Sequence, residues 1–98
     1  MDNLLLLDTT LRDGSYVTDF QMDEAIKRPI IDALSCAGIE IIECGFIEHG
    51  RAGTDIGSAV YGSEYALNPY IAPKKPESLR YIFRRQVLPI GNIIILKV

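Results

Sequence analysis

The residues of this sequence that could do chemistry stand near the ends of two apolar segments. Arg12 and Asp13 follow the run Leu4–Leu7, and Glu43 lies near the end of the run Ile39–Cys44. A carboxylate offers oxygen ligands to a hard divalent cation, and such a cation polarises a carbonyl group. An arginine, charged at any working pH, stabilises the oxyanion that then develops. Together these residue types suit enolate chemistry next to a carbonyl.

The same residues also fit a purely structural interpretation. An Arg-Asp-Gly sequence is common in solvated turns, where Gly14 gives the backbone the freedom to turn tightly. A glutamate at the end of a strand is commonly a surface residue. The spacing alone therefore leaves a catalytic and a structural role open.

A strand, a helix and a second strand would place these residues. Leu4–Leu7 has no polar alternation, which predicts a strand buried on both faces, as in parallel sheets. Asp23 is a good N-cap for a helix over Glu24–Ala37, and Ile39–Cys44 reads as the next strand. This order matches a βαβ unit with parallel strands. Because sites in such sheets form at the carboxyl ends of the strands, both groups are expected on one edge.

The helix has one apolar stripe and one awkward residue. Residues at helical spacing that are expected to face the core are Ile26, Ile30, Ala33, Leu34 and Ala37. Polar residues expected mostly on the other side are Lys27, Arg28, Asp32 and Ser35. Pro29 removes a backbone hydrogen bond from a helix interior, so we expect a kink or a later start.

The rest of the chain is less informative. Glycines and prolines break residues 45–76 into a long connection, which in compact domains is often functional or mobile. Residues 77–87 could form a short helix or a strand, and Ile93–Leu96 is a strand candidate. Cys36 and Cys44 show no metal or disulfide spacing, so we interpret them as small buried residues of a reducing compartment.

Two motifs resemble a known enzyme superfamily. Residues 8–14, Asp-Thr-Thr-Leu-Arg-Asp-Gly, resemble the opening signature of the metal-dependent lyases and synthases with a TIM barrel. Residues 37–46, Ala-Gly-Ile-Glu-Ile-Ile-Glu-Cys-Gly-Phe, resemble the second strand of that superfamily. Its members include 3-hydroxy-3-methylglutaryl-CoA lyase, 2-isopropylmalate synthase, homocitrate synthase, 4-hydroxy-2-oxovalerate aldolase and the carboxyltransferase domain of pyruvate carboxylase. The resemblance covers residues 4–47, and residues 48–98 are not placed by it.

The resemblance implies a fold, a cofactor and roles for three residues. The fold would be α/β, with residues 1–98 as the amino-terminal βαβ portion of a TIM barrel that this chain leaves incomplete. Arg12 would stabilise the enolate-like intermediate, Asp13 would bind a divalent metal, Mg²⁺ or Mn²⁺, and Glu43 would lie beside the substrate. The implied substrate is a small 2-oxo acid or an acyl-CoA type compound.

The sequence departs from the superfamily at two positions of the site. The superfamily completes its metal site with a His-x-His pair, whereas this sequence has a single histidine, His49, which we interpret as a loop residue. The continuation Gly14-Ser15-Tyr16 resembles the aldolase-like branch most. In that branch a histidine base stands where Tyr16 stands here, so the identity of the base stays open.

Length argues for a fragment or a truncated gene product. A TIM barrel needs about 250 residues, and the chain has 98. One carboxylate binds a divalent ion poorly, so we expect little activity from this chain alone. The alternative is a non-catalytic remnant that docks to a partner, or to a copy of itself as a homo-oligomer, through an exposed sheet edge.

Other classes are disfavoured. A phosphatase of the haloacid-dehalogenase type needs a second aspartate two residues after Asp8, where Thr10 stands. A net charge of −3 without a basic stripe argues against nucleic acid. No apolar run approaches the roughly 20 residues of a membrane helix, and the acidic start lacks the basic region of a signal peptide. A cytoplasmic location is therefore expected.

Overall fold

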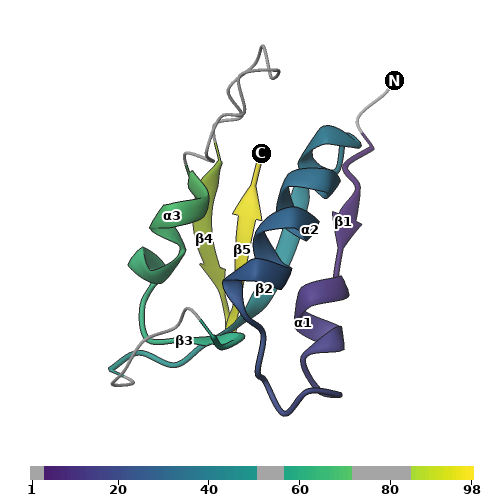
Figure 1. Cartoon of the computed structure of the whole chain (residues 1–98). Helices are drawn as coiled ribbons and strands as arrows, with labels where there is room; N and C mark the ends of the chain where they lie inside the picture. The colour runs from purple at the N-terminus through teal and green to yellow at the C-terminus, as the bar shows by residue number, and fades with distance from the viewer. Residues whose placement is uncertain (1–3, 51–56, 72–84) are drawn as a thin grey trace.

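The fold is a mixed sheet with helices packed against it. The computed structural model describes residues 4–50, 57–71 and 85–98. In chain order the elements are β1 (Leu7–Asp8), α1 (Thr10–Gly14), α2 (Glu24–Cys36), β2 (Ile41–Ile47), β3 (Val60–Tyr61), the 3-10 helix η1 (Glu64–Leu67), α3 (Asn68–Ile71), β4 (Gln86–Ile90) and β5 (Ile93–Lys97). Strand β1 runs directly into α1, and α2 crosses back over the sheet to reach β2 (Figure 1).

The predicted βαβ unit is confirmed. Strands β1 and β2 are parallel, with Leu7 opposite Ile41, and α2 connects them. The sheet order is β1-β2-β5-β4, and β3 pairs in parallel with the last residues of β2. Strands β5 and β4 are antiparallel to their neighbours. The α/β class therefore holds and is compatible with a partial TIM-barrel-like domain, but the sheet is mixed where a barrel would be parallel.

A tight hairpin makes this antiparallel half of the sheet. The predicted strand Ile93–Leu96 is confirmed as β5, and it pairs with β4 from Gln86 to Ile90. Gly91 and Asn92 form the two-residue turn, and Gly91 has a φ of +62°. A positive φ at the first turn residue matches the twist of antiparallel strands. Residues 77–87 were expected to form a short helix or a strand. Residues 77–84 of this segment lie outside the described residues, and residues 86–87 belong to β4.

Helix α2 ends one residue earlier than predicted and contains its proline. It begins at Glu24, so the later start is wrong, and the kink that was the other expectation stays a prediction. Proline cannot donate to the carbonyl of Ala25, four residues before it. Both residues are exposed, so water can satisfy that carbonyl.

The buried face of α2 differs from the predicted stripe. Its buried residues are Lys27, Ile31 and Ser35, whereas Ile26 is 50% exposed. Ala33 and Ala37 are exposed as well, so the prediction is wrong by about one residue, or 100° of helical rotation. Only Ile30 and Leu34, of the expected stripe, pack partly against the core.

Polar contacts from distant segments explain the burial of Lys27. Its Nζ donates to the carbonyl of Ser58 at 2.8 Å and to the hydroxyl of Tyr61 at 3.1 Å. The same Nζ lies 4.8 Å from the centre of the Tyr61 ring. A buried ammonium is tolerated when its hydrogen bonds are made and when aromatic faces surround it. Helical periodicity cannot reveal partners more than thirty positions away.

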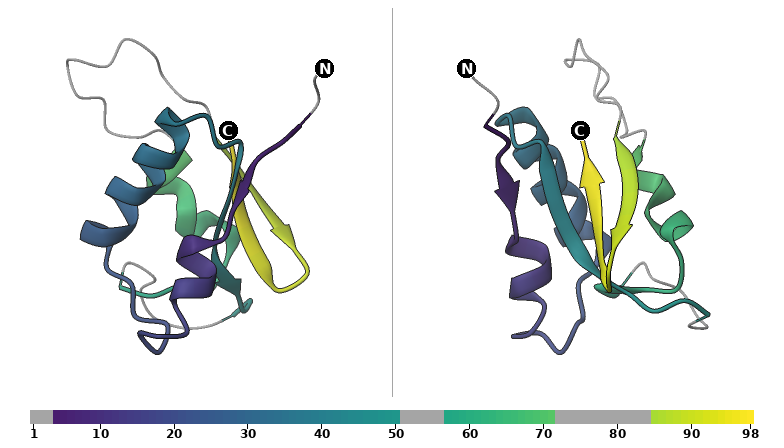
Figure 2. Two further views of the ribbon diagram at one scale, coloured as in Figure 1. Left: turned by 90° about the vertical axis from the view of Figure 1, so that its right-hand side faces the viewer. Right: turned by 180° about the vertical axis from the view of Figure 1, so that it is seen from behind.

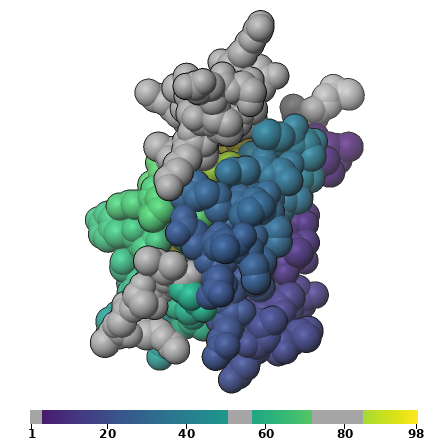
Figure 3. Space-filling model, in the orientation of Figure 1, coloured from purple at the N-terminus to yellow at the C-terminus, as the bar shows by residue number. Residues whose placement is uncertain are grey.

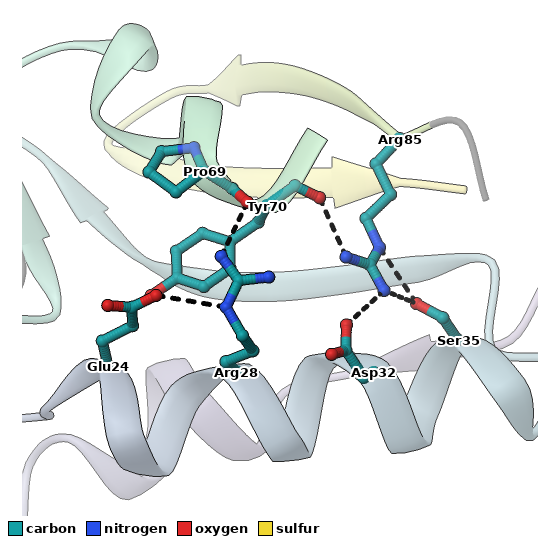
Figure 4. Close-up of polar contacts among 7 residues, drawn as sticks. All are labelled: Glu24, Arg28, Asp32, Ser35, Pro69, Tyr70 and Arg85. Carbon is teal, nitrogen blue, oxygen red and sulfur yellow. Dashed lines mark hydrogen bonds and ion pairs between the residues drawn. The ribbon is translucent and has the colours of Figure 1, made fainter. Parts of the chain in front are cut away.

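Two arginines fasten α2 to the segment around α3 and β4, and we call them the arginine clamp (Figure 4). Arg85 donates to the Tyr70 carbonyl at 2.8 Å, to the Asp32 carboxylate at 2.8 Å and to the Ser35 hydroxyl at 2.9 Å. Arg28 binds the Glu24 carboxylate at 3.1 Å and the Pro69 carbonyl at 2.7 Å, with its guanidinium over the Tyr70 ring. Polar residues of α2 thus pack against other segments of the chain.

The core lies between the sheet and the helices on one of its faces. Views from the side and from behind show α2 and α3 on the same face (Figure 2). The space-filling view shows α2 spread over the middle of that face, with α3 bordering it (Figure 3). The core residues drawn from both layers include Leu11, Ile31, Ile42, Leu67, Tyr70, Ile94 and Leu96.

The first apolar run is more exposed than predicted. Strand β1 covers only Leu7 and Asp8, and exposure falls from 89% at Leu4 to 51% at Leu7. The expectation of a strand buried on both faces is therefore wrong for this chain. The reason is positional, because β1 stands at the edge of the sheet order and has β2 as its paired neighbour.

The two cysteines have different environments. Cys44 is buried in β2, and burial raises the pKa of its thiol to about 12. Cys36, at the end of α2, is exposed, so its predicted burial is wrong. Within the described ranges, no helix has the length and apolar character to span a membrane.

Candidate active site

Two of the three predicted site residues meet beside the end of β1. Glu43 was expected near the end of its strand, but it lies within β2, which continues beyond the predicted end at Cys44 to Ile47. The Nε of Arg12 donates to Oε1 of Glu43 at 2.6 Å. Arg12 comes from α1, directly after β1, and Glu43 from the middle of β2. The parallel pairing of the two strands brings residues 31 positions apart into contact. The pair is partly buried, with side-chain exposures of 23% and 14%.

Short-range contacts hold α1 in this position. The Asp8 carboxylate accepts hydrogen bonds from the backbone N–H and the hydroxyl of Thr10, both at 2.9 Å. Such side-chain contacts favour a turn immediately after the strand. Leu11 is fully buried and anchors α1 in the core. The buried Ser15 hydroxyl donates to the Arg12 carbonyl at 2.6 Å, which fixes the backbone that carries the guanidinium.

The electrostatics keep Arg12 charged. The hydrogen bond to Glu43 raises the pKa of the guanidinium above its usual value, and Tyr16 adds to the effect. A guanidinium has five N–H donors, and the bond to Glu43 uses the one on Nε. The Nη groups form the planar end that binds carboxylates in a bidentate way. Glu43 thus orients the Arg12 guanidinium through Nε, and the two Nη groups are not part of this ion pair.

A bulge in β2 places an aromatic residue on the same face as Glu43. The register with β5 shifts between Glu43 and Gly45, so that Glu43 lies opposite Ile95 and Phe46 lies opposite Ile93. Directly opposite residues in antiparallel strands share a face. Without the extra residue, Phe46 would point to the other side of the sheet.

Gly45 makes this bulge possible. Its φ is +150°, and a Cβ there would lie 2.0 Å from the carbonyl oxygen of Ala59. That oxygen accepts the Phe46 N–H at 2.8 Å, so the close approach is part of the pairing between β2 and the segment before β3. A glycine inside a strand often marks such an approach.

A pocket of about 780 Å³ is lined by Tyr16, four residues after Arg12, and by Phe46, three residues after Glu43. Three aromatic rings, those of Tyr16, Phe20 and Phe46, contact one another edge to face, with all centroid distances at 5.7 Å. All three line the pocket, together with residues around Ser58 and the hairpin turn at Asn92. Neither Phe20 nor Phe46 was singled out from the sequence. The glycine before Phe46 was the one available signal of a bulge.

Comparison with known proteins places the chain in a family. A family model described as HMGL-like matches residues 3–68, about two thirds of the chain. The chain belongs to the HMGL-like family. The match continues beyond residue 47 and includes β3, η1 and the first residue of α3. The suspected superfamily resemblance is thereby confirmed for this amino-terminal part.

Three curated relatives resemble the HMGL-like chain over about half its length. Oxaloacetate decarboxylase from Mycobacterium tuberculosis is 44% identical over 55 residues, which are 56% of this chain and 15% of that protein. 4-Hydroxy-2-oxovalerate aldolase 6 from Rhodococcus jostii is 43% identical, with 50% and 13% covered. 2-Isopropylmalate synthase from Parabacteroides distasonis is 42% identical, with 46% and 9% covered.

The matched segments are thus a small part of each relative, 15% or less of its length. No solved structure matches this chain. The relatives named here are a decarboxylase, an aldolase and a synthase. They therefore support a lyase, aldolase or synthase lineage without selecting one reaction.

The third predicted site residue, Asp13, is exposed on α1. Among the described residues, no hydrogen bond or ion pair of its carboxylate is seen. His49 contacts the Glu64 carboxylate at 3.1 Å, in agreement with a loop role. Within residues 4–50, 57–71 and 85–98, no group of three His, Cys, Asp or Glu could hold a metal ion. The described residues therefore do not by themselves fit a divalent metal.

Proposed function

We propose that this chain forms the amino-terminal part of an aldolase- or lyase-type site that binds a 2-oxo acid through Arg12. The observation that carries the proposal is the Arg12–Glu43 ion pair, which joins the helix that follows β1 to the neighbouring strand β2. Support comes from membership in the HMGL-like family and from relatives whose names include an oxaloacetate decarboxylase and a 2-oxovalerate aldolase. The C–C bond to be cleaved or formed would lie next to the bound carbonyl.

The chemistry assigned to Arg12 is binding and charge stabilisation. The planar Nη end of its guanidinium suits the adjacent carboxylate and carbonyl oxygens of a 2-oxo acid. As an enolate forms, negative charge grows on the carbonyl oxygen, and a fixed cation stabilises it. Glu43 would hold the guanidinium at the right angle and lie beside the substrate. Tyr16, which raises the pKa of Arg12, stands where the resemblance to the aldolase-like branch would place a histidine base.

Asp13 is proposed as a single metal ligand within a larger site. Its exposed carboxylate leaves room for a cation such as Mg²⁺ or Mn²⁺. Further ligands would have to come from outside the described residues. The proposal therefore does not extend to turnover by this chain alone, and no catalytic step is assigned to a metal here.

Binding of pyruvate to the 98-residue chain tests the role of Arg12. Arg12→Gln removes the charge and is expected to weaken pyruvate binding at least about tenfold in a titration followed by NMR chemical shifts, because a charge-assisted bidentate contact is lost. The matched control is Lys97→Gln, an exposed cation on β5, which should leave the affinity within about twofold. Equal affinities of wild-type and Arg12→Gln chains would refute the proposal.

The second candidate is docking through the exposed leucines before α1. Their exposure, from 89% at Leu4 to 51% at Leu7, favours it, because an open strand edge with apolar side chains invites pairing. If the chain docks to itself, sedimentation velocity should show a dimer that Leu5→Lys converts to a monomer. A chain that stays monomeric at all concentrations would count against self-association.

A further inference from the structure

We infer that the pocket beside Arg12 selects 2-oxo acids that carry an apolar side chain of aromatic size over small or dicarboxylic ones. The inference rests on the proposed function, since Arg12 supplies the contact to the carboxylate end of the ligand. The pocket would then receive the other end. What decides selectivity is the chemistry of the pocket wall.

The wall nearest to Arg12 is aromatic. Tyr16 lines the pocket and stands four residues after Arg12, on the turn that continues α1, where the Tyr16 N–H donates to the Asp13 carbonyl. Tyr16 also raises the pKa of Arg12, in agreement with this proximity. The rings of Tyr16, Phe20 and Phe46 meet edge to face, which leaves their remaining surfaces partly exposed. Aromatic pairs favour edge-to-face and offset contacts, and a further ring can add to them.

The backbone fixes these rings before any ligand arrives. Asp19 and Phe20 both have positive φ values, +54° and +63°, which non-glycine residues seldom adopt. The turn is held because the Phe20 N–H donates to the Ser15 carbonyl at 2.7 Å and the Phe20 carbonyl accepts the Ala59 N–H at 2.8 Å. Phe46 is held by the bulge at Gly45 and by the hydrogen bond from its N–H to the Ala59 carbonyl. A preformed wall orders few groups on binding, which favours affinity.

Size and charge agree with an apolar ligand. A pocket of about 780 Å³ lies within the range of roughly 300–1,000 Å³ found for small-molecule sites. None of its described lining residues is basic, and Asp19 and Glu48 add carboxylates. Among these described residues, a second carboxylate on the ligand would meet like charge and no cation. An uncharged apolar side chain meets no such penalty.

The test compares three 2-oxo acids on the 98-residue chain by NMR titration: pyruvate, 2-oxoglutarate and 2-oxo-4-phenylbutanoate. The phenyl compound is expected to bind about tenfold more tightly than pyruvate, since it buries an aromatic group. Phe46→Ala should bring the affinity for the phenyl compound down to the affinity of the same variant for pyruvate. If Phe46→Ala does not fold, Phe46→Leu replaces it and should remove about half of the advantage on a logarithmic scale.

The outcomes separate this inference from the proposed function. If all three acids bind equally and Arg12→Gln weakens each, the proposed function stands and the selectivity is refuted. If 2-oxoglutarate binds as tightly as the phenyl compound, the charge argument is refuted. If the phenyl compound binds equally well to wild-type and Arg12→Gln chains, the pocket is a general apolar site and the selectivity for 2-oxo acids is refuted. The proposed function fails as well only if pyruvate binding is equally insensitive to Arg12→Gln.

Discussion

Gly45→Ala is expected to destabilise the fold by at least about 3 kcal/mol, a large part of the roughly 5–15 kcal/mol available to a domain of this size. The added Cβ would lie 2.0 Å from the Ala59 carbonyl oxygen, at a φ of +150° that side chains rarely adopt. Ala59 cannot easily move away to remove this clash, because its carbonyl oxygen accepts the Phe46 N–H and its own N–H donates to the Phe20 carbonyl. The measurement is the urea midpoint of unfolding.

Gly14→Ala is the matched control for this substitution. A Cβ at Gly14 meets nothing within 4 Å, and its φ is not positive. The expected change is neutral or stabilising by less than about 1 kcal/mol, because alanine restricts the unfolded chain. If both variants unfold at the urea midpoint of the wild-type chain, the bulge does not hold β2 against the segment before β3 in the way described.

Arg85→Ala is expected to cost about 3 kcal/mol of stability. The side chain is fully buried within the arginine clamp, and its loss leaves the Tyr70 carbonyl and the Ser35 hydroxyl without their donor. It also leaves the half-buried Asp32 carboxylate without its cation. Removing one partner of a buried ion pair is strongly destabilising because the remaining polar groups stay desolvated.

The comparison for Arg85 is Arg28→Ala in the same clamp. Arg28 makes fewer bonds, to the Glu24 carboxylate and the Pro69 carbonyl, and its Nη1 is buried without a partner. Pro69 is exposed, so water can replace the lost donor. Its expected cost is about 1 kcal/mol. Thermal melts that rank Arg28→Ala as the more damaging change would contradict the role given to Arg85.

The sequence predicts the part of the site that depends on the order of strands, helix and polar residues along the chain. Two apolar runs, a helix between them and polar residues after each run are enough to expect parallel strands. Parallel pairing then predicts that Arg12 and Glu43 lie on the same side of the sheet, and the structure adds a direct contact of 2.6 Å between them. Asp13 follows Arg12 in the sequence, yet its carboxylate has no partner in the part of the chain that the structure describes.

What the sequence does not reveal depends on long-range contacts. The face of α2 is set by Lys27 reaching Ser58 and by Arg85 reaching back to Asp32, and neither partner is visible in the helical spacing. The antiparallel hairpin could have been predicted from the sequence, since glycine and asparagine separate two apolar runs at its turn. The aromatic pocket could not have been predicted in this way, because it depends on a bulge that turns Phe46 to the same face of the sheet as Glu43.

The most direct test of the central claim observes the Arg12 guanidinium itself. In an ¹H–¹⁵N spectrum of the 98-residue chain, the Nε–H signal that disappears in Arg12→Gln belongs to this residue. Addition of pyruvate should shift that signal in a saturable way, and Glu43→Gln should weaken the response because the guanidinium is no longer oriented. If the signal stays in place while pyruvate shifts other arginines or none, Arg12 does not bind 2-oxo acids, and the proposed function is wrong.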